Sequence, residues 1–229
     1  MSIEDQKQAA GELAASWVEA GMVVGLGTGS TAVHAIRAIG ARIDSGELRE
    51  VLAIPTSRAS EAEAIVRNVP LTSLAEHPVV DLTIDGADEV DASLDLIKGA
   101  GAALWREKIV AQASAREVIV VDDTKPTPQL GTRFAVPVEV AEFGWRPEAE
   151  YLDDMGATVT LRRGADGAEA VTDEGNWILD CAFGPIADPA RLAGLLDRRA
   201  GIVAHGLFLG LATDLLVASP AGVEHRVRP

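Results

Sequence analysis

Met22-Val-Val-Gly-Leu-Gly-Thr-Gly-Ser-Thr31 couples a short apolar run to a glycine-rich loop. Residues 22–26 are apolar or β-branched, which predicts a buried strand that stops at the glycines. Residues 31–39 have helical spacing, and Gly40 is expected to end that helix. A strand, a glycine-rich turn and a helix in this order predict the first unit of a parallel α/β fold.

The same alternation continues on both sides of this loop. A helix is expected before it, over residues 3–19, with Gly21 at its end. Strands that alternate with helices pair in parallel, so the expected fold is α/β with a doubly wound, mostly parallel, Rossmann-like sheet. The further segments expected in this sheet and its helices are strands at 51–54, 79–84 and 118–121 and helices at 61–66 and 102–113.

The pattern changes after Leu130, where a second, smaller region is expected. Short strands and a turn at Asp173-Glu-Gly-Asn176 predict an α+β subdomain inserted into the larger one. The expected division is a catalytic domain of residues 1–130 plus 206–229 and an inserted subdomain of residues 131–205. The expected elements are strands at 134–140, 158–161 and 177–181, helices at 147–155 and 189–196, and closing strands at 215–218 and 223–227.

Composition limits the kinds of partner. The chain has 229 residues with a formal net charge of −15, so it repels polyanions, and nucleic acid is not an expected partner. No apolar run is long enough to span a bilayer, and the acidic N-terminus is not a signal peptide. The one cysteine, Cys181, predicts a buried apolar residue in a cytoplasmic protein. A phosphate site in so acidic a chain has to be local, built from backbone N–H groups and a few lysines.

The glycine-rich loop is open to several interpretations. A dinucleotide fingerprint needs glycine where Ser30 stands and an acidic residue after the second strand, where Pro55-Thr-Ser57 occurs instead. A nucleotide P-loop needs a lysine before Ser30 or Thr31, and none is present. The loop could be a plain strand-to-helix turn with a hydroxyl N-cap. We favour a cradle for a small phosphorylated or carboxylated ligand, because ligands of such sheets bind beyond the carboxyl ends of the strands.

Acidic and basic side chains follow the third expected strand. Asp85-Gly-Ala-Asp-Glu89 places three carboxylates at the end of that strand. Ordinary turns also use Asp and Gly, but crowded carboxylates have raised pKa values that suit proton transfer. Lys98-Gly-Ala-Gly-Ala-Ala-Leu-Trp-Arg-Glu-Lys108 then sets a lysine before a glycine turn and a helix that carries Glu107. Glu107 is a candidate general base there, and the alternative is a solvated charge cluster on a surface helix.

Five segments in this order and spacing, GLGTGST, DGADE, KGAGAALWREK, VDDTK and VPVEV, resemble the type A ribose-5-phosphate isomerases. The resemblance extends from Lys7 to the Leu207-Phe208 region. The family usually has three glycines where this chain has Gly99-Ala100-Gly101, and usually a smaller, more polar residue at Trp105. Neither departure changes a reactive group.

The resemblance implies a function and a set of site residues. It implies cofactor-independent interconversion of ribose 5-phosphate and ribulose 5-phosphate through an enediolate, with Glu107 as the base and Asp85, Asp88 and Lys98 as catalytic partners. The expected phosphate ligands are Ser30, Thr31, Lys7 and Lys125. The substrate-binding residues implied are Thr28, Gly29, Ser30, Thr31, Asp85, Gly86, Ala87, Asp88, Lys98, Gly99, Ala100, Gly101, Lys125 and Lys7.

Other functions remain to be weighed beside this one. A metal could stabilise an enediolate, but the four histidines have no ligand-like spacing, so we expect no metal and no cofactor. A sugar-phosphate sensor would need a basic DNA-binding module. An acyl-CoA transferase or an amino-sugar phosphate isomerase on the same architecture is not excluded by the chemistry of the residues. The family implies a homodimer or homotetramer, and no membrane partner is expected.

Overall fold

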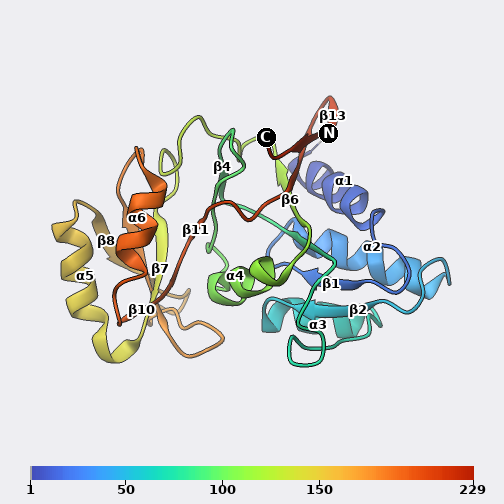
Figure 1. Ribbon diagram of the computed structural model, residues 1–229, viewed down its shortest axis with the longest axis horizontal. Coiled ribbons are helices and arrows are strands. Elements are labelled where there is room, and N and C mark those ends of the chain that lie inside the picture. The colour runs from blue at the N-terminus through green and yellow to red at the C-terminus, as the bar shows by residue number, and fades with distance from the viewer. Residues whose placement is uncertain (1) are drawn as a thin grey trace. The chain divides into compact units, whose positions relative to one another are not determined.

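The computed structural model describes residues 2–229, which fall into two compact units (Figure 1). Unit 1 comprises the described residues up to Ala87 together with Arg106–Lys125 and Gly210–Pro229. Unit 2 comprises Asp88–Trp105 and Pro126–Leu209. The segment with the acidic turn and the lysine is therefore divided, with Asp85 and Glu107 in unit 1 and Asp88 and Lys98 in unit 2.

Unit 1 is built on a six-stranded sheet with the strand order β13-β12-β6-β3-β1-β2. All neighbouring strands pair in parallel except β12 and β13, which form an antiparallel hairpin. The strand order reverses at β1, which has β2 on one side and β3 on the other, and the carboxyl ends of the five parallel strands lie at one edge of the sheet. The strands are β1 Val23–Leu26, β2 Leu52–Pro55, β3 Leu82–Asp85, β6 Glu117–Asp122, β12 Asp214–Ser219 and β13 Gly222–Val227.

Helices cover both faces of this sheet, which confirms the doubly wound α/β prediction. Alternate residues of β1 point to opposite faces, so Val24 and Leu26 pack in the cluster that holds α1 and α2, while Val23 packs with Val110 of α4. The blue helices α1 and α2 lie side by side in Figure 1. The helices are α1 Ile3–Ala15, α2 Ala32–Asp44, α3 Arg58–Val66 and α4 Leu104–Ala113.

Two helix ends differ from the sequence prediction. The helix expected to stop at Gly40 continues to Asp44, because Gly40 lies inside α2 where a Cβ would come within 2.6 Å of the Arg67 Cβ. This glycine permits close packing and does not terminate the helix. The first helix ends at Ala15, well before Gly21, and the Ser16 hydroxyl donates to the Leu13 carbonyl at that end.

Unit 2 contains a four-stranded antiparallel sheet with the order β10-β7-β9-β8. One face packs on α5 and α6, and the core there includes Val138, Leu152, Leu196 and the fully buried Cys181. Burial raises the pKa of the Cys181 thiol to about 12, with a smaller contribution from the charge of Asp180. The elements are β7 Val136–Val140, η1 Glu142–Gly144, α5 Trp145–Asp154, β8 Thr158–Leu161, β9 Trp177–Ala182, α6 Pro189–Leu196 and β10 Ile202–His205.

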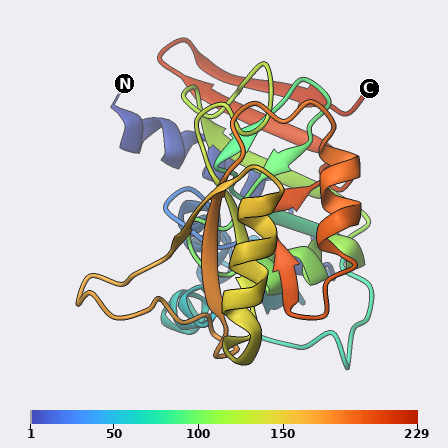
Figure 2. The same ribbon diagram turned by 90° about the vertical axis from the view of Figure 1, so that its left-hand side faces the viewer.

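Between β8 and β9 the chain forms an arm, residues 162–176, which Figure 2 shows as a long tan-orange hairpin extending from the sheet. The turn expected at 173–176 is present, since the Thr172 N–H donates to the Asn176 carbonyl and the Gly175 N–H donates to the Thr172 carbonyl. A three-stranded sheet of order β11-β5-β4 was not expected from the sequence. Its strands β4 Glu89–Val90, β5 Leu96–Ile97 and β11 Leu207–Phe208 are too short to give a periodic signal.

None of the helices described over residues 2–229 is both long enough and apolar enough to cross a membrane.

Candidate functional site

In unit 1 the side chain of Asp85, at the end of β3, accepts a hydrogen bond from the backbone of the glycine-rich loop. The Asp85 Oδ1 accepts the N–H of Thr28 at 3.0 Å and the N–H of Gly86 at 2.7 Å, and its residue is fully buried. The Gly27 N–H donates to the Ile84 carbonyl at 2.9 Å. A Cβ on Gly27 would lie only 2.3 Å from the Asp85 Oδ1, so the loop and this carboxylate can approach only because residue 27 is glycine.

Hydroxyl groups line the same loop. The Thr28 Oγ1 lies 2.8 Å from the Thr56 Oγ1 and donates to the Ser57 Oγ at 2.7 Å. Thr31 precedes α2 without a side-chain capping bond. The Ser30 Oγ accepts a hydrogen bond from the Lys7 Nζ at 2.9 Å. The cation of Lys7, the exposed residues 29 and 30 and the N-terminus of α2 therefore lie close together, which is what a small anion needs.

A cavity of about 320 Å³ opens beside this loop. Its lining comes from three segments and is mostly apolar: Gly27, Thr28, Gly29, Val33, Ile36, Ala59, Ser60 and Glu63. No lysine or arginine lines it. We therefore do not assign the phosphate to this cavity, because a phosphate in an acidic chain needs a cation or several N–H donors.

Glu107 lies in the first turn of α4 and is only 4% exposed. Its sequence neighbours Arg106 and Lys108 are half-buried. This burial excludes the surface charge cluster as an account of Glu107. A carboxylate in the first turn also interacts favourably with the positive end of the helix dipole. Lys125 lies in the turn after β6, where its backbone N–H donates to the Asp122 carbonyl. The residue is half-buried.

In unit 2 the lysine of the second loop is almost fully enclosed. Lys98 follows β5 and is 2% exposed, and its Nζ lies 5.6 Å from the centre of the Phe208 ring. A cation over an aromatic face is stabilised by the negative charge of the ring face. The Lys98 N–H donates to the Gly206 carbonyl at 2.9 Å, which joins the loop to the chain before β11.

The loop after Lys98 turns sharply. Gly99 has φ 113°, and a Cβ there would meet Leu104 at 3.0 Å and Pro137 at 3.1 Å. The Ala100 N–H donates to the Asp88 Oδ2 at 2.9 Å. Left-handed backbone occurs at Gly99 and again at Ala102, φ 56°, so the alanine at position 100 does not occupy the position that most needs glycine.

Hydrogen bonds link part of the expected site residues into two groups, one in each unit. Unit 1 brings together Asp85 and Gly86 with Thr28, and Ser30 with Lys7. Unit 2 brings together Asp88, Lys98 and the backbone of 99–101. Within residues 2–229 there is no group of three or more His, Cys, Asp or Glu side chains arranged to hold a metal ion.

Sequence reasoning missed several residues that support these groups. The hydroxyl groups of Thr56 and Ser57 hydrogen-bond to the Thr28 hydroxyl. Their position directly after the second parallel strand could have identified them as site residues. Arg162 contacts the carbonyls of the second loop, and it gave no signal because two consecutive arginines after a strand are ordinary surface residues.

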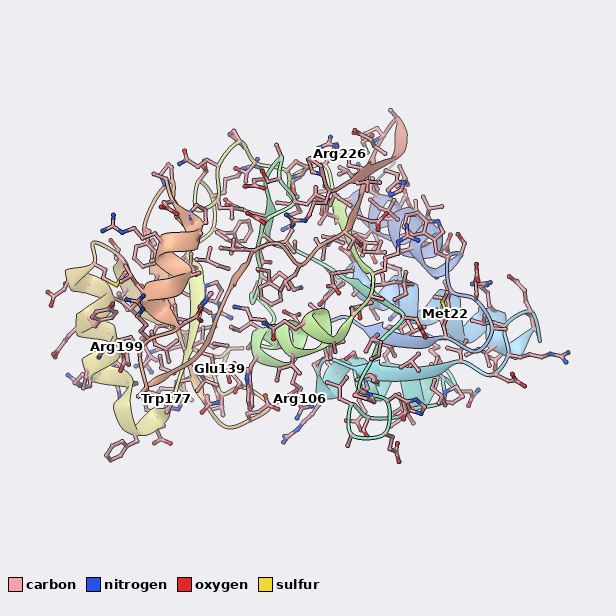
Figure 3. All side chains as sticks on the ribbon, viewed as in Figure 1. Met22, Arg106, Glu139, Trp177, Arg199 and Arg226 are labelled. Carbon is pink, nitrogen blue, oxygen red and sulfur yellow. The ribbon has the colours of Figure 1, made fainter. Side chains whose placement is uncertain are left out.

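A buried carboxyl in unit 2 was also missed. Glu139 on β7 is fully buried, and its Oε1 accepts hydrogen bonds from Thr172 and Asn176, both at 2.9 Å. Figure 3 labels this side chain and Trp177, which begins the neighbouring strand β9. Burial raises the pKa of Glu139, the two hydrogen bonds oppose that, and the nearby charges of Glu174 and Asp173 add to it.

Comparison with known proteins gives a consistent family match. The model of the family described as ribose 5-phosphate isomerase A (phosphoriboisomerase A) matches residues 52–222. A ribose-5-phosphate isomerase A from Chloroflexus aurantiacus is 55% identical over 224 residues, covering 98% of this chain and 94% of its own. Its counterpart from Gluconobacter oxydans is 53% identical over 221 residues, covering 96% and 95%.

Solved structures agree with the sequence matches. A D-ribose-5-phosphate isomerase in complex with phospho-erythronic acid superposes with a TM-score of 0.97 at 35% identity, covering all of both chains. A ribose 5-phosphate isomerase A from Methanocaldococcus jannaschii superposes with a TM-score of 0.94 at 38% identity, covering 99% of this chain and 100% of its own.

Proposed function

The chain belongs to the ribose 5-phosphate isomerase A family, and we propose that Glu107 is the base with which it performs the family's reaction. It is an isomerase that interconverts D-ribose 5-phosphate and D-ribulose 5-phosphate. The burial of a single carboxylate in the first turn of α4 is the observation that carries the assignment to Glu107.

The reaction moves protons between neighbouring atoms of one sugar. In the open-chain aldose the base removes the proton on C2, and the electrons form the C1–C2 double bond of an enediolate. The base then returns the proton to C1, while the hydroxyl proton passes from O2 to O1, which leaves a ketone at C2. No electron leaves the substrate, so the proposal includes neither a nicotinamide nor another cofactor.

Glu107 suits this role on physical grounds. A base that is largely shielded from water keeps the abstracted proton from exchanging before it returns to the neighbouring carbon. The carboxylate of Glu107, at 4% exposure, meets that requirement. One carboxylate can serve both carbons because they are adjacent in the substrate.

Lys98 and the two aspartates supply the remaining chemistry in this proposal. Lys98 stabilises the negative charge that develops on the sugar oxygens, and its enclosure strengthens that interaction. Asp88 is half-exposed and carries the hydroxyl proton and assists ring opening. Asp85 acts mainly through the loop, since its Oδ1 already accepts two N–H groups.

The phosphate group binds at the glycine-rich loop in this proposal. Ser30 and Lys7 already lie 2.9 Å apart, and Thr31 stands at the start of α2. Lys125 is the fourth ligand. A phosphate held away from the reacting carbons supplies binding energy that keeps C1 and C2 at the base.

The variant Glu107→Gln tests the base. We expect kcat to fall by about 10³-fold, because the amide cannot accept the C2 proton. Binding of phospho-erythronic acid, which a solved relative holds, should persist, since its carboxylate resembles the two oxygens of an enediolate. The exposed Glu12→Gln on α1 is the matched control and should retain full activity. Near-normal turnover by the Glu107 variant excludes it as the base, and turnover lost on chelation excludes the metal-free mechanism.

We propose further that the protein is a cytoplasmic homodimer or homotetramer with no nucleic-acid or membrane partner. The single cysteine and the net charge of −15 support the compartment and the lack of a polyanionic partner. Light scattering on the purified protein tests the assembly. The division into a catalytic domain, 1–130 plus 206–229, and an inserted 131–205 is likewise a proposal, tested by limited proteolysis.

A further inference from the structure

Arg162 joins the end of β8 to the loop that carries Lys98. Its Nη1 donates to the Gly99 carbonyl at 2.7 Å and to the Ala100 carbonyl at 3.1 Å. Its Nε donates to the Asp180 Oδ2 at 2.9 Å, and its Nη2 donates to the other oxygen of the same carboxylate. One guanidinium therefore contacts two successive carbonyls and one carboxylate at the same time.

This arrangement depends on the shape of arginine. A guanidinium is planar and presents five donors in fixed directions, so pairing two of them with Asp180 sets the orientation of the third nitrogen. The Arg162 side chain is 17% exposed, which limits competition from water. Lysine has a single nitrogen and cannot hold the carboxylate bidentately while also contacting both carbonyls.

The base of the arginine is fixed as well. The Arg162 N–H donates to the Ile178 carbonyl at 2.9 Å, and the Arg162 carbonyl accepts the Ala170 N–H at 2.9 Å. Further along the arm, Thr172 and Asn176 both bond to the buried Glu139. The guanidinium is therefore presented from ordered backbone and not from a mobile loop end.

The contacts of Arg162 determine which way the loop amides point. In a planar trans peptide the N–H points opposite to the C=O. Because Arg162 holds the carbonyls of Gly99 and Ala100, the N–H groups of Ala100 and Gly101 point away from it. The Ala100 N–H reaches the Asp88 Oδ2 on that other side, so Arg162 and Asp88 hold one peptide group from its two ends.

We infer that Arg162, held by Asp180, is a positioning residue of the isomerase reaction, which fixes the Lys98–Gly101 loop and through it the Asp88 carboxylate. The inference rests on the roles proposed above for Lys98 and Asp88. A displacement of about 1 Å in a group near the reacting atoms can cost about 100-fold in rate, so such a support has a measurable effect.

The test compares Arg162→Met with Arg163→Met. Arg163 is the matched control, because it lies next in the chain and its side chain bonds to the Gly167 carbonyl and pairs with Glu169, both on the arm. We expect Arg162→Met to lose about 100-fold in kcat with a much smaller change in KM. Arg163→Met should stay within about twofold of the parent enzyme. Thermal unfolding of both variants shows whether either has lost its fold.

Chemical rescue keeps the test decisive if the methionine variant is poorly folded. Millimolar guanidinium should restore part of the kcat of Arg162→Ala and none in Arg163→Ala, because only the first leaves a site shaped for a guanidinium beside Asp180. Arg162→Lys should recover little. Equal kcat in the Arg162 and Arg163 variants, or no rescue, overturns the inference.

A parallel Lys98→Met variant separates this inference from the proposed function. If Lys98→Met is inactive while Arg162→Met is normal, the positioning inference is wrong and the role of Lys98 stands. If Lys98→Met is itself near-normal, the proposed role of Lys98 is wrong, and with it the basis of the inference.

Discussion

The two glycine-containing loops, residues 25–31 in unit 1 and 98–101 in unit 2, look alike in sequence but are held in opposite ways. A buried carboxylate, Asp85, accepts the N–H of Thr28 in the first loop. A guanidinium, Arg162, donates to two carbonyls of the second. The first glycine that matters, Gly27, is required by the space beside Asp85, whereas Gly99 is required by its backbone conformation, φ 113°.

This difference teaches that glycine content alone does not say what a loop tolerates. A glycine required for close approach fails when any side chain is added, because the neighbour must move. A glycine required for positive φ fails by strain, which the surroundings can partly absorb. The substitutions that follow separate these two cases.

Gly27→Ala should have the largest effect. The new Cβ would lie 2.3 Å from the Asp85 Oδ1 and 2.5 Å from the Asp85 Cα, so a buried carboxylate and its backbone must shift. We expect the free energy of unfolding to fall by about 3 kcal/mol, measured by denaturant titration. Gly29→Ala is the control, since its Cβ meets nothing within 4 Å and only φ 112° is strained, about 1 kcal/mol. Equal losses in the two variants would contradict the steric account of Gly27.

Gly99→Ala should cause the next largest loss of stability. Its φ of 113° and contacts of 3.0 Å to Leu104 and 3.1 Å to Pro137 predict a loss of about 2 kcal/mol in the free energy of unfolding. We also expect kcat to fall, and by more than unfolding of part of the protein would explain, because the same peptide group orients the Ala100 N–H toward Asp88. Steady-state kinetics beside thermal unfolding checks this, and a variant with normal kcat would show that the loop adapts.

Lys7→Met acts on the first loop without disturbing its glycines. Loss of the cation beside Ser30 should raise KM for ribose 5-phosphate about 10-fold, equivalent to about 1.4 kcal/mol, with kcat little changed. The rise should shrink at high ionic strength, where the charge of the parent lysine is screened. An unaltered KM at low salt would remove Lys7 from the phosphate site.

Glu139→Gln should have the smallest effect. It should raise the free energy of unfolding at neutral pH, whereas the glycine variants lower it. Burial raises the pKa of Glu139 in the folded protein, so the folded state holds this proton more tightly than the unfolded chain. Stability is therefore lost as the pH rises from the ordinary carboxyl range through the raised pKa. Glutamine keeps the oxygen that Thr172 and Asn176 contact and carries no charge. We expect it to stabilise the protein at neutral and higher pH and to change little below about pH 4.

Unfolding curves of both proteins across that pH range supply the measurement. Arg162 bonds to the second loop from the start of the arm that Glu139 contacts, so ionisation of Glu139 should also loosen the support that Arg162 gives to the loop. A glutamine variant that is less stable than the parent enzyme at every pH would show that Glu139 stabilises the arm as a carboxylate.

The sequence predicted the parallel part of the fold well. Apolar runs that stop at Gly25, Asp85 and Asp122 identify β1, β3 and β6, because buried parallel strands are nearly continuous apolar segments. The helix that passes through Gly40 was misjudged because close packing against Arg67 cannot be read from a single glycine. The strands of two residues each, such as β4 and β11, carry no periodicity at all.

The candidate site was predictable where side chains follow parallel strands and hidden where support comes from a distant segment. Asp85 and the loop beginning at Gly25 meet at one sheet edge, which the strand pattern implies. Arg162 lies 62 positions after Ala100 in the sequence and reaches the second loop from an antiparallel arm, whose direction no local pattern specifies. The resemblance named the residues with chemical roles but not the residues that orient them.

The buried thiol of Cys181 can report how often unit 2 opens. A thiol whose pKa is about 12 and which has no access to solvent reacts with a maleimide or disulfide reagent only when the core around it opens. Because the one cysteine of the chain lies in unit 2, labelling reports openings that expose this unit, and an opening confined to unit 1 leaves the thiol unlabelled. The labelling rate, followed by mass spectrometry, thus measures the opening rate of the core of unit 2 without any engineered probe.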